Sequence, residues 1–348
     1  MRMLDTSTGR FSDQLHHRRV RYAILSHVWS RREHSNYAEY PAPDSSILPH
    51  LSDKVQKACE LARSHNFKYL WIDTCCIDKT SSSELSKAIN SMFEWYRCAK
   101  VCYAFLVDVH DGVLDDRYSG FVESEWWNRG WTLQELIAPP HVLFLTNSWT
   151  PFGTKQTLSW LITSAFGIDE KVLRNERVLS DVCVAERMSW AANRKTTEDE
   201  DEAYCLIGIF GVNVTPIYGE GQHAFVRLQH AILAQIPDQT LFAWGGREKV
   251  KLPLHGDPKF FHAAGEASIS QHQLSQKLAM GHVTYPHYTA TSFGMRTSFP
   301  MLSYTTDHGV EISLAFLACE HISGASENLL ALILRHSPTS KEKYVGVI

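Results

Sequence analysis

The first 150 residues of the sequence predict an α/β fold built on a mainly parallel sheet. Two observations carry this prediction: short apolar runs typical of buried strands, and intervening stretches in which apolar residues recur at helical spacing. Strands joined by single helices imply crossover connections, so helices are expected to cover both faces of the sheet. The expected strands are Tyr22–Val28, Phe67–Ile72, Val101–Val107 and His141–Leu145.

Amphipathic helices are expected to connect these strands. One begins after Ser52, a residue type that caps helix N-termini well, and another begins at the capping-box pattern of Ser81 and Glu84. Each has a single apolar face, which is expected to pack against the sheet. These faces consist of Val55, Ala58, Cys59 and Ala62 in the first helix, and of Leu85, Ile89, Met92, Phe93 and Tyr96 in the second.

The pattern changes twice after residue 150. Residues 151–236 are expected to form a helical segment, in which Thr197 and Glu200 indicate a further capping box. The acidic run Glu198–Glu202 suits a helix N-terminus better than a metal site. Residues 237–348 are expected to form a mainly β C-terminal region, whose last sheet we expect to be incomplete because the chain stops within the apolar stretch KYVGVI. The expected β segments are Thr240–Trp244, His282–Thr289, Ser298–Tyr304, Val310–Leu317, Leu329–Leu334 and Tyr344–Ile348.

Composition disfavours several classes of protein. The formal net charge of −4 and the pI of about 6.5 provide no basic field for nucleic acid or an anionic membrane. No apolar run approaches the ~18 residues of a membrane span, and the N-terminus lacks the apolar stretch of a secretory signal. The eight cysteines include no C-x-x-C pair. We therefore expect a reduced, soluble, cytoplasmic protein without a structural metal.

Common catalytic motifs are absent from the sequence. No G-x-G-x-x-G follows a strand, and the P-loop, H-E-x-x-H and G-x-S-x-G patterns do not occur. The Gly219–Gly221 stretch is expected to be a turn into a helix rather than a phosphate loop. Ordinary dinucleotide dehydrogenases, P-loop NTPases, zinc proteases and α/β-hydrolases are therefore not supported.

Candidate ligand-binding residues follow the expected strands. Ligands of open parallel sheets bind at the carboxyl ends of the strands. Ser26, His27 and Trp29 lie there after the first strand, and Asp73 and Asp78 lie there after the second. Neighbours on a strand point to opposite faces, so Ser26 and His27 are not expected to form a nucleophile pair, although either can contact a ligand. For the two aspartates, loop capping is favoured over holding a metal or a ribose.

The segment Glu123–Pro140, ESEWWNRGWTLQELIAPP, has the highest density of chemically informative residues. Trp127, Trp131 and Glu135 are spaced i, i+4 and i+8, so a continuous helix would align them, although Gly130 can break the turn. A carboxylate beside an indole suits a pocket for a flat cationic ring. Spacing alone favours the structural alternative, in which the tryptophans pack under a loop and Glu135 is a surface acid.

Arg129 lies between these tryptophans. Its guanidinium is suited to a bidentate contact with a phosphate. The alternative is an ion pair with Glu123 or Glu125, which the residues alone slightly favour.

Three blocks of this sequence together resemble the fungal heterokaryon-incompatibility (HET) domain. They are YAILSHVWS, YLWIDTCCIDK and EWWNRGWTLQELIAP, and they occur in order within residues 1–150. Downstream, TTEDEDEAYCLIGIFGVNVTPIYGEGQHAFVRLQHAIL and PDQTLFAW are similar to the segments that commonly follow that domain. The chain departs from the family pattern at Lys79, where the family often has Gln, and at His27, where Tyr is common.

The resemblance implies a role in non-self recognition between fungal cells, a form of innate immunity that ends in programmed cell death. The HET domain is thought to be a distant relative of the TIR domain, which implies a flavodoxin-like order of strands and helices. Matched on the tryptophan-rich block, Glu135 takes the position of the TIR catalytic glutamate. Some TIR domains cleave NAD at the nicotinamide–ribose bond. NAD is then the expected substrate rather than a resident cofactor, with Trp127 or Trp131 stacking on nicotinamide and Arg129 meeting the pyrophosphate.

Two functions of different classes follow from this resemblance. The first is a cytoplasmic cell-death effector whose HET domain hydrolyses NAD when the protein self-associates. The second is a non-enzymatic, TIR-like signalling module that binds an incompatibility partner or receptor protein, with the tryptophans at its interface. Neither function involves nucleic acid, a membrane span or a metal.

Overall fold

The computed structural model describes residues 1–12, 15–29, 51–112, 114–243, 266–281, 283–284, 286–291, 294–305, 311–323, 326–337 and 340–347. The chain divides into two compact units. The first consists of Met1–Arg177, Arg194–Thr197 and Cys205–Pro216, and the second of Val178–Asn193, Glu198–Tyr204 and Ile217–Ile348. The division at residues 150 and 236 that the sequence indicates stays a prediction.

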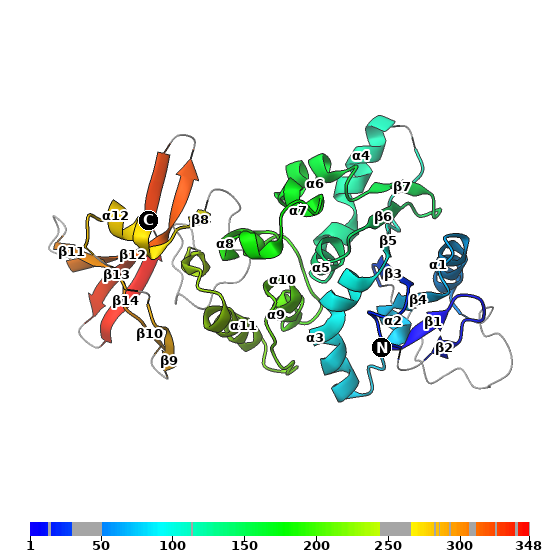
Figure 1. Ribbon diagram of the computed structural model, residues 1–348, viewed down its shortest axis with the longest axis horizontal. Coiled ribbons are helices and arrows are strands. Elements are labelled where there is room, and N and C mark those ends of the chain that lie inside the picture. The colour runs from blue at the N-terminus through cyan, green and yellow to red at the C-terminus, as the bar shows by residue number, and fades with distance from the viewer. Residues whose placement is uncertain are drawn as a thin grey trace. The chain divides into compact units, whose positions relative to one another are not determined.

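In the described part of the chain, the first unit is built on a seven-stranded sheet of order β2-β1-β4-β3-β5-β6-β7 (Figure 1). The expected strands appear as β3 (Tyr22–His27), β4 (Tyr69–Ile72), β5 (Val101–Phe105) and β6 (Val142–Leu145). These strands pair in parallel and form the middle of the sheet. The prediction of a mixed α/β fold with a mainly parallel sheet is therefore confirmed.

Short antiparallel strands extend both edges of this sheet. On one side β1 (Met3–Asp5) pairs with β4 and with β2 (Phe11–Ser12), and on the other β7 (Pro151–Thr154) pairs with β6. No sequence pattern predicted them, because strands of two to four residues are too short to show periodicity.

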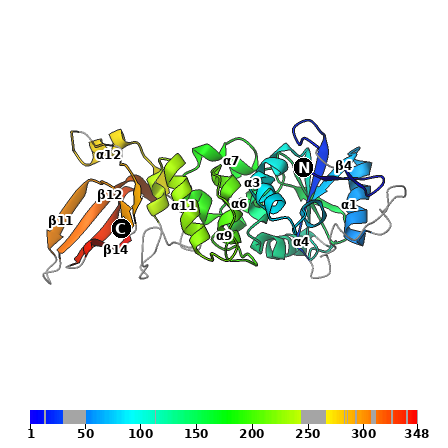
Figure 2. The same ribbon diagram turned by 90° about the horizontal axis from the view of Figure 1, so that it is seen from below.

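Helices cover both faces of the sheet (Figures 1 and 2). Helix α1 (Asp53–Ser64) lies on one side of the parallel strands, and α3 (Ser82–Cys98) lies on the other together with α5 (Thr132–Ile137). In chain order the parallel strands run second, first, third, fourth across the sheet. Right-handed crossovers then place the connecting helices on opposite faces. The connections diverge between β3 and β5, which makes this junction the topological switch point of the sheet.

The first turns of the two connecting helices show which capping predictions hold. Ser52 Oγ accepts a hydrogen bond from the Val55 amide, and Ser81 Oγ accepts one from the Glu84 amide at 3.3 Å. The capping box predicted at Ser81 does not form completely, because the Glu84 side chain does not accept the Ser81 amide. The Glu84 carboxylate instead accepts the amide of Asp78 at 3.0 Å and pairs with Arg2 at 3.1 Å.

The first unit contains further short helices around this framework. Helix α10 packs against α3 and α5, the two helices on one face of the sheet. The bounds are α2 Asp73–Cys76, α4 Leu114–Glu123, the 3₁₀ helix η3 Glu125–Asn128, α6 Ser159–Phe166, α7 Glu170–Leu173 and α10 Ile207–Phe210.

The second unit combines helices with a β region whose described strand pairs are antiparallel. Its larger sheet has the order β11-β12-β13-β14, with β8 also paired to β12, and β9 pairs with β10. The helical elements are η4 Leu179–Asp181, α8 Val184–Ser189, α9 Asp201–Tyr204, α11 His223–Gln235, η5 Gln239–Phe242 and α12 Gln271–Lys277. The strands are β8 Glu266–Ser268, β9 Thr289–Thr291, β10 Gly294–Arg296, β11 Met301–Thr305, β12 Glu311–Ser323, β13 Ser326–Ser337 and β14 Ser340–Val347.

Three local predictions for the second unit are wrong. Of the strand expected over His282–Thr289, the described residues 283–284 and 286–288 form no strand, and only Thr289 belongs to β9. The strand expected from Thr240 begins instead as the 3₁₀ helix η5, because the Asp238 side chain accepts the Thr240 amide at 2.9 Å and caps a turn; Trp244 lies outside the described residues. The Glu200 carboxylate does not complete a capping box. It accepts the backbone amides of Gly219 and Gly221 at 2.7 and 2.8 Å.

No helix in the described ranges has both the length and the apolar character needed to cross a membrane.

The contact between α10 and α3 requires a glycine. A Cβ added to Gly208 would lie 2.1 Å from the Cβ of Phe93, far inside van der Waals contact. We expect Gly208→Ala to lower the free energy of unfolding by about 1–3 kcal/mol, the usual effect of overpacking, as measured by urea denaturation. The control is Gly120→Ala in α4, where an added Cβ meets nothing within 4 Å. Equal stabilities of the two variants would contradict this packing argument.

Candidate active site

The end of β3 and the short helix α5 bring together a buried carboxyl, a hydroxyl and an indole. Ser26 Oγ donates a hydrogen bond to Glu135 Oε2 and accepts one from Trp126 Nε1 at 2.7 Å. The exposed fractions are 1% for Ser26, 4% for Glu135 and 0% for Trp126. The Tyr96 hydroxyl, which donates to Leu25 O at 3.1 Å, also interacts with Glu135. Ser26 lies at the switch point between β3 and β5, so the group occupies the position where doubly wound sheets bind ligands.

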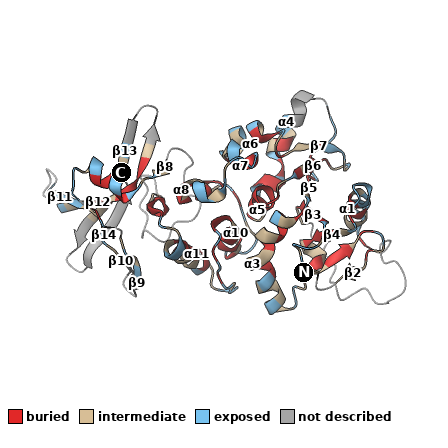
Figure 3. Cartoon of the chain, viewed as in Figure 1, coloured by how far each residue is buried: buried red, intermediate tan, exposed pale blue. Residues whose placement is uncertain are grey.

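Helix α5 is buried along its length and hydrogen-bonded near both ends. All six of its residues are buried, as Figure 3 shows by the red ribbon of α5. At its start, Thr132 Oγ1 donates to Trp126 O at 2.6 Å and receives a hydrogen bond from Arg194 at 2.8 Å. Just beyond its end, the buried Lys155 ammonium donates to Pro139 O at 2.6 Å. Glu135 is therefore positioned by a rigid element.

The turn before α5 is fixed by a segment from later in the chain. The Gly130 amide donates to Lys195 O at 2.8 Å, and the Lys195 amide donates to Asn128 O at 2.6 Å. A Cβ on Gly130 would lie 2.6 Å from Thr196 Cγ2, so only glycine allows this close approach. The turn separates η3 from α5, so the continuous helix considered in the sequence analysis does not form.

This break overturns the alignment of Trp127 and Trp131 with Glu135. The buried Trp127 stacks on Phe166 with 4.3 Å between ring centroids and donates from Nε1 to Phe121 O at 2.7 Å, so it is a core residue. Trp131 is the half-buried residue that precedes α5. The indole that reaches the carboxyl group is that of Trp126, through Ser26. Trp126 was not predicted, because the i, i+4 spacing selected its neighbour Trp127.

A second part of the site is charged. Trp29 Nε1 donates to Asp73 Oδ2 at 2.8 Å. The Lys79 ammonium lies 3.5 Å from the centroid of the Trp29 ring, and the Arg129 guanidinium carbon lies 5.7 Å from it. An indole with two cations nearby is an aromatic platform for positive charge. We refer to Ser26, Trp29, Asp73, Trp126, Arg129 and Glu135 as the strand-end cluster.

The two carboxyl groups of this cluster hold their protons unusually firmly. Burial, together with the charge of Asp73, raises the pKa of Glu135 to about 8, and this outweighs its hydrogen bond from Ser26 and the charge of Arg129. Burial likewise raises the pKa of Asp73, against the opposing effects of Lys79 and the Trp29 hydrogen bond. Two acids that interact in this way resist losing both protons, which is a common property of catalytic pairs.

Comparison with known proteins identifies the domain that holds the first part of this cluster. Residues 22–119 match the family described as heterokaryon incompatibility protein (HET). The chain contains a HET domain. It is also 42% identical over 219 residues to the vegetative incompatibility protein HET-E-1 of Podospora anserina, a match that covers 61% of this chain and 16% of that protein. Residues 223–256 match a domain of unknown function, DUF8212. No solved structure matches the chain.

The range matched to the HET family includes only part of the cluster. Ser26, Trp29 and Asp73 lie within residues 22–119, whereas Trp126, Arg129 and Glu135 follow it. The fold brings the later residues back to the end of β3. Asp108, which follows β5, accepts hydrogen bonds from Ser124 Oγ at 2.6 Å and from the Glu125 amide at 2.7 Å. These two bonds hold the start of η3 at the end of β5.

Besides Trp127 and Trp131, two further residues expected at the site lie outside the cluster. His27 points to the other face of the HET-domain sheet, beside a cavity of about 10 Å³ near the start of α1, which has room for one water at most. Burial and the charge of Lys54 lower the pKa of His27 well below its ordinary range, so its ring is neutral at pH 7. Asp78 caps its own loop, accepting the Thr80 amide at 2.9 Å and the Thr80 hydroxyl at 2.6 Å.

The raised pKa of Glu135 makes the stability of the chain depend on pH. The carboxyl ionises near its ordinary pKa of 4.5 when unfolded but only near 8 when folded, so the folded chain binds more protons between these values. This stabilisation is fully present below pH 4.5 and is lost as the pH rises through 8. Relative to wild type, we expect Glu135→Gln to gain about 1.4 kcal/mol in unfolding free energy per pH unit over that interval, measured by urea denaturation.

The matched control for this measurement is Glu125→Gln, because Glu125 is exposed in the neighbouring helix η3. Its difference from wild type is expected to stay constant with pH. A Glu135→Gln curve parallel to that of wild type would mean that Glu135 is ionised in the folded chain.

Proposed function

We propose that this protein is a cytoplasmic effector of fungal non-self recognition whose HET domain hydrolyses NAD at the nicotinamide–ribose bond, with Glu135 as the catalytic carboxylate. The incompatibility role is supported by the HET domain and by the relative's name, vegetative incompatibility protein. The relative is much longer than this chain, which covers 16% of it, so the role of the whole protein is part of the proposal.

The observation that carries the enzymatic part is the position of Glu135, buried against Ser26 at the switch point of the sheet. The sheet order also supports the proposed relation to TIR domains, since second-first-third-fourth is the order of flavodoxin-like sheets. Asp73 and Trp29 follow neighbouring strands and complete an acidic and aromatic surrounding.

The proposed reaction converts NAD⁺ and water into nicotinamide, ADP-ribose and a proton. The bond between the ribose C1′ and the ring nitrogen breaks, and its electron pair goes to the nitrogen, which leaves as part of neutral nicotinamide. Positive charge then develops on the ribose, as in glycoside hydrolysis. The Glu135 carboxylate stabilises this charge and takes a proton from the water that adds to C1′.

Substrate binding itself would prepare Glu135 for this role. The free carboxyl is protonated at pH 7 because its pKa is about 8. A cationic nicotinamide nearby favours the ionised carboxylate and lowers that pKa. Because Glu135 is 4% exposed, NAD reaches it only after the surrounding side chains move. We propose that self-association promotes this opening.

The second candidate is a non-enzymatic, TIR-like module that binds an incompatibility partner or receptor. The low exposure of Glu135, 4%, favours it, because a carboxyl group closed off from solvent can serve a purely structural role. In that case the cluster only positions the HET-domain surface.

An NAD hydrolysis assay distinguishes the two functions. Purified protein at concentrations that promote assembly is incubated with NAD, and nicotinamide release is followed by chromatography. We expect turnover in wild type, a loss of at least 100-fold in Glu135→Gln, and wild-type rates in Glu125→Gln. Circular dichroism confirms that the variants fold. An assembled wild type without turnover would refute the enzymatic proposal and favour the interaction module.

Trp29 provides a separate test of how the substrate binds. If the nicotinamide ring stacks on this indole, Trp29→Ala loses about 1–3 kcal/mol of binding, the size of a base-stacking contact, and KM rises by roughly 5- to 150-fold. Trp29→Phe is expected to restore much of the affinity. Trp127→Phe, a substitution in the core, is expected to leave KM unchanged. An unchanged KM in Trp29→Ala would remove Trp29 from the substrate site.

A further inference from the structure

A cavity in the first unit lies away from the strand-end cluster. It has a volume of about 320 Å³. Its walls are the segments that lead into β3, β5 and β6: residues 17–20, 97–100 and 140–141. These segments lie at the amino ends of the parallel strands. Ser26 and Glu135 lie at the carboxyl ends, so the cavity is at the opposite ends of the strands.

The side chains around this cavity are predominantly basic. Arg18, Arg97 and Lys100 line it together with His17 and His141, and none of the lining residues within the described part of the chain is acidic. These residues come from separate parts of the chain, and the parallel sheet brings them together. The Glu94 carboxylate balances one of these positive charges, and the remaining positive charge of the concave site attracts anions. This local charge is not apparent from the net charge of −4 of the whole chain.

Glu94, on the last turns of α3, orients the two arginines. Arg97 contacts its carboxylate through Nε at 2.7 Å and Nη2 at 2.9 Å. Arg18 contacts it through Nε at 3.0 Å and Nη2 at 2.9 Å. Among the hydrogen bonds within the described residues, Nη1 of neither arginine is used. The arginine side chains are 64% and 55% exposed, so these donors are accessible from solvent.

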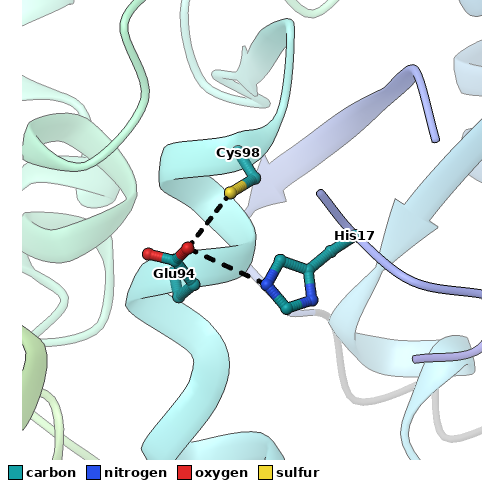
Figure 4. Close-up of side chains that lie close together, drawn as sticks. All are labelled: His17, Glu94 and Cys98. Atoms are coloured by element: carbon teal, nitrogen blue, oxygen red, sulfur yellow. Dashed lines mark hydrogen bonds and ion pairs between the residues drawn. The ribbon is translucent and has the colours of Figure 1, made fainter. Parts of the chain in front are cut away.

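A metal ion is the alternative ligand at this place. Figure 4 shows His17, Glu94 and Cys98 directed toward one another, and their potential ligand atoms lie within 4.8 Å of each other. Two guanidinium groups already occupy the Glu94 carboxylate, so a divalent cation there would face strong repulsion. Burial and the hydrogen bond to Glu94 raise the pKa of the Cys98 thiol, which disfavours the thiolate that a metal needs. The charges therefore favour an anion.

We propose that this cavity binds a phosphate ester of about nucleotide size, with Arg18, Arg97 and Lys100 contacting the phosphate. Paired guanidinium groups suit the bidentate recognition of phosphate oxygens. The volume of about 320 Å³ exceeds what a single phosphate fills and lies at the lower end of the range for small-molecule pockets. The site is separate from the strand-end cluster, so the proposal does not depend on NAD hydrolysis.

Isothermal titration with AMP tests the proposal on the full chain. We expect saturable binding by wild type, weakened at least tenfold in Arg97→Gln and in Lys100→Gln, and weakened by added NaCl. The control is Arg174→Gln, which removes an equal charge at an exposed ion pair with Glu176 and is expected to bind as wild type does.

The other results of this experiment would overturn the proposal. Absence of saturable AMP binding in wild type refutes it, as does equal weakening in Arg174→Gln. Inorganic phosphate that binds as tightly as AMP would refute a ligand of nucleotide size. Zinc that binds wild type and is lost in both His17→Ala and Cys98→Ser, while AMP does not bind, would establish the metal site instead.

Discussion

The contact between Ser26 and Glu135 is the constraint on which the candidate site depends. Its two residues are 109 positions apart, and both are buried. A carboxyl group removed from water needs hydrogen-bond partners, and Ser26 provides one that is itself held by Trp126. The fixed ends of α5 and the close approach at Gly130 keep the carboxyl group on the strand end. The same contacts serve stability and, in our proposal, catalysis.

The side chains at the amino ends of the parallel strands differ in chemical character from those at the carboxyl ends. At the carboxyl ends of the strands, the buried Glu135 and the half-buried Asp73 are accompanied by indoles and by the cations Lys79 and Arg129. At the amino ends, basic side chains surround a cavity of about 320 Å³. The direction of the strands explains this separation. In a parallel sheet, all segments that lead into strands lie at the amino ends, and all segments that follow strands lie at the carboxyl ends. One sheet therefore carries two groups of side chains of different chemical character.

Local patterns predicted the regular elements of the first unit well, and long-range contacts less well. The helix starts at Ser52 and Ser81 were correct because a cap depends on neighbours in sequence. The predicted hydrogen bond from Ser81 to the Glu84 side chain was wrong, because Asp78 and Arg2, which lie outside the helix, bind that side chain. Trp127 was selected by its spacing, yet the turn at Gly130, fixed by residues 195 and 196, rotates the tryptophans away from that pattern.

The sequence by itself determined the parallel α/β framework, the positions of Ser26 and Asp73 at strand ends, and the resemblance to the HET family, since each depends on periodicity or on contiguous residues. Only the tertiary structure decided that Trp126 reaches Ser26, that Trp127 belongs to the core and that His27 points to the other face. It also decided that basic residues from three segments share one cavity. The physical reason is distance along the chain: burial and pKa arise from neighbours in space, which no local pattern encodes.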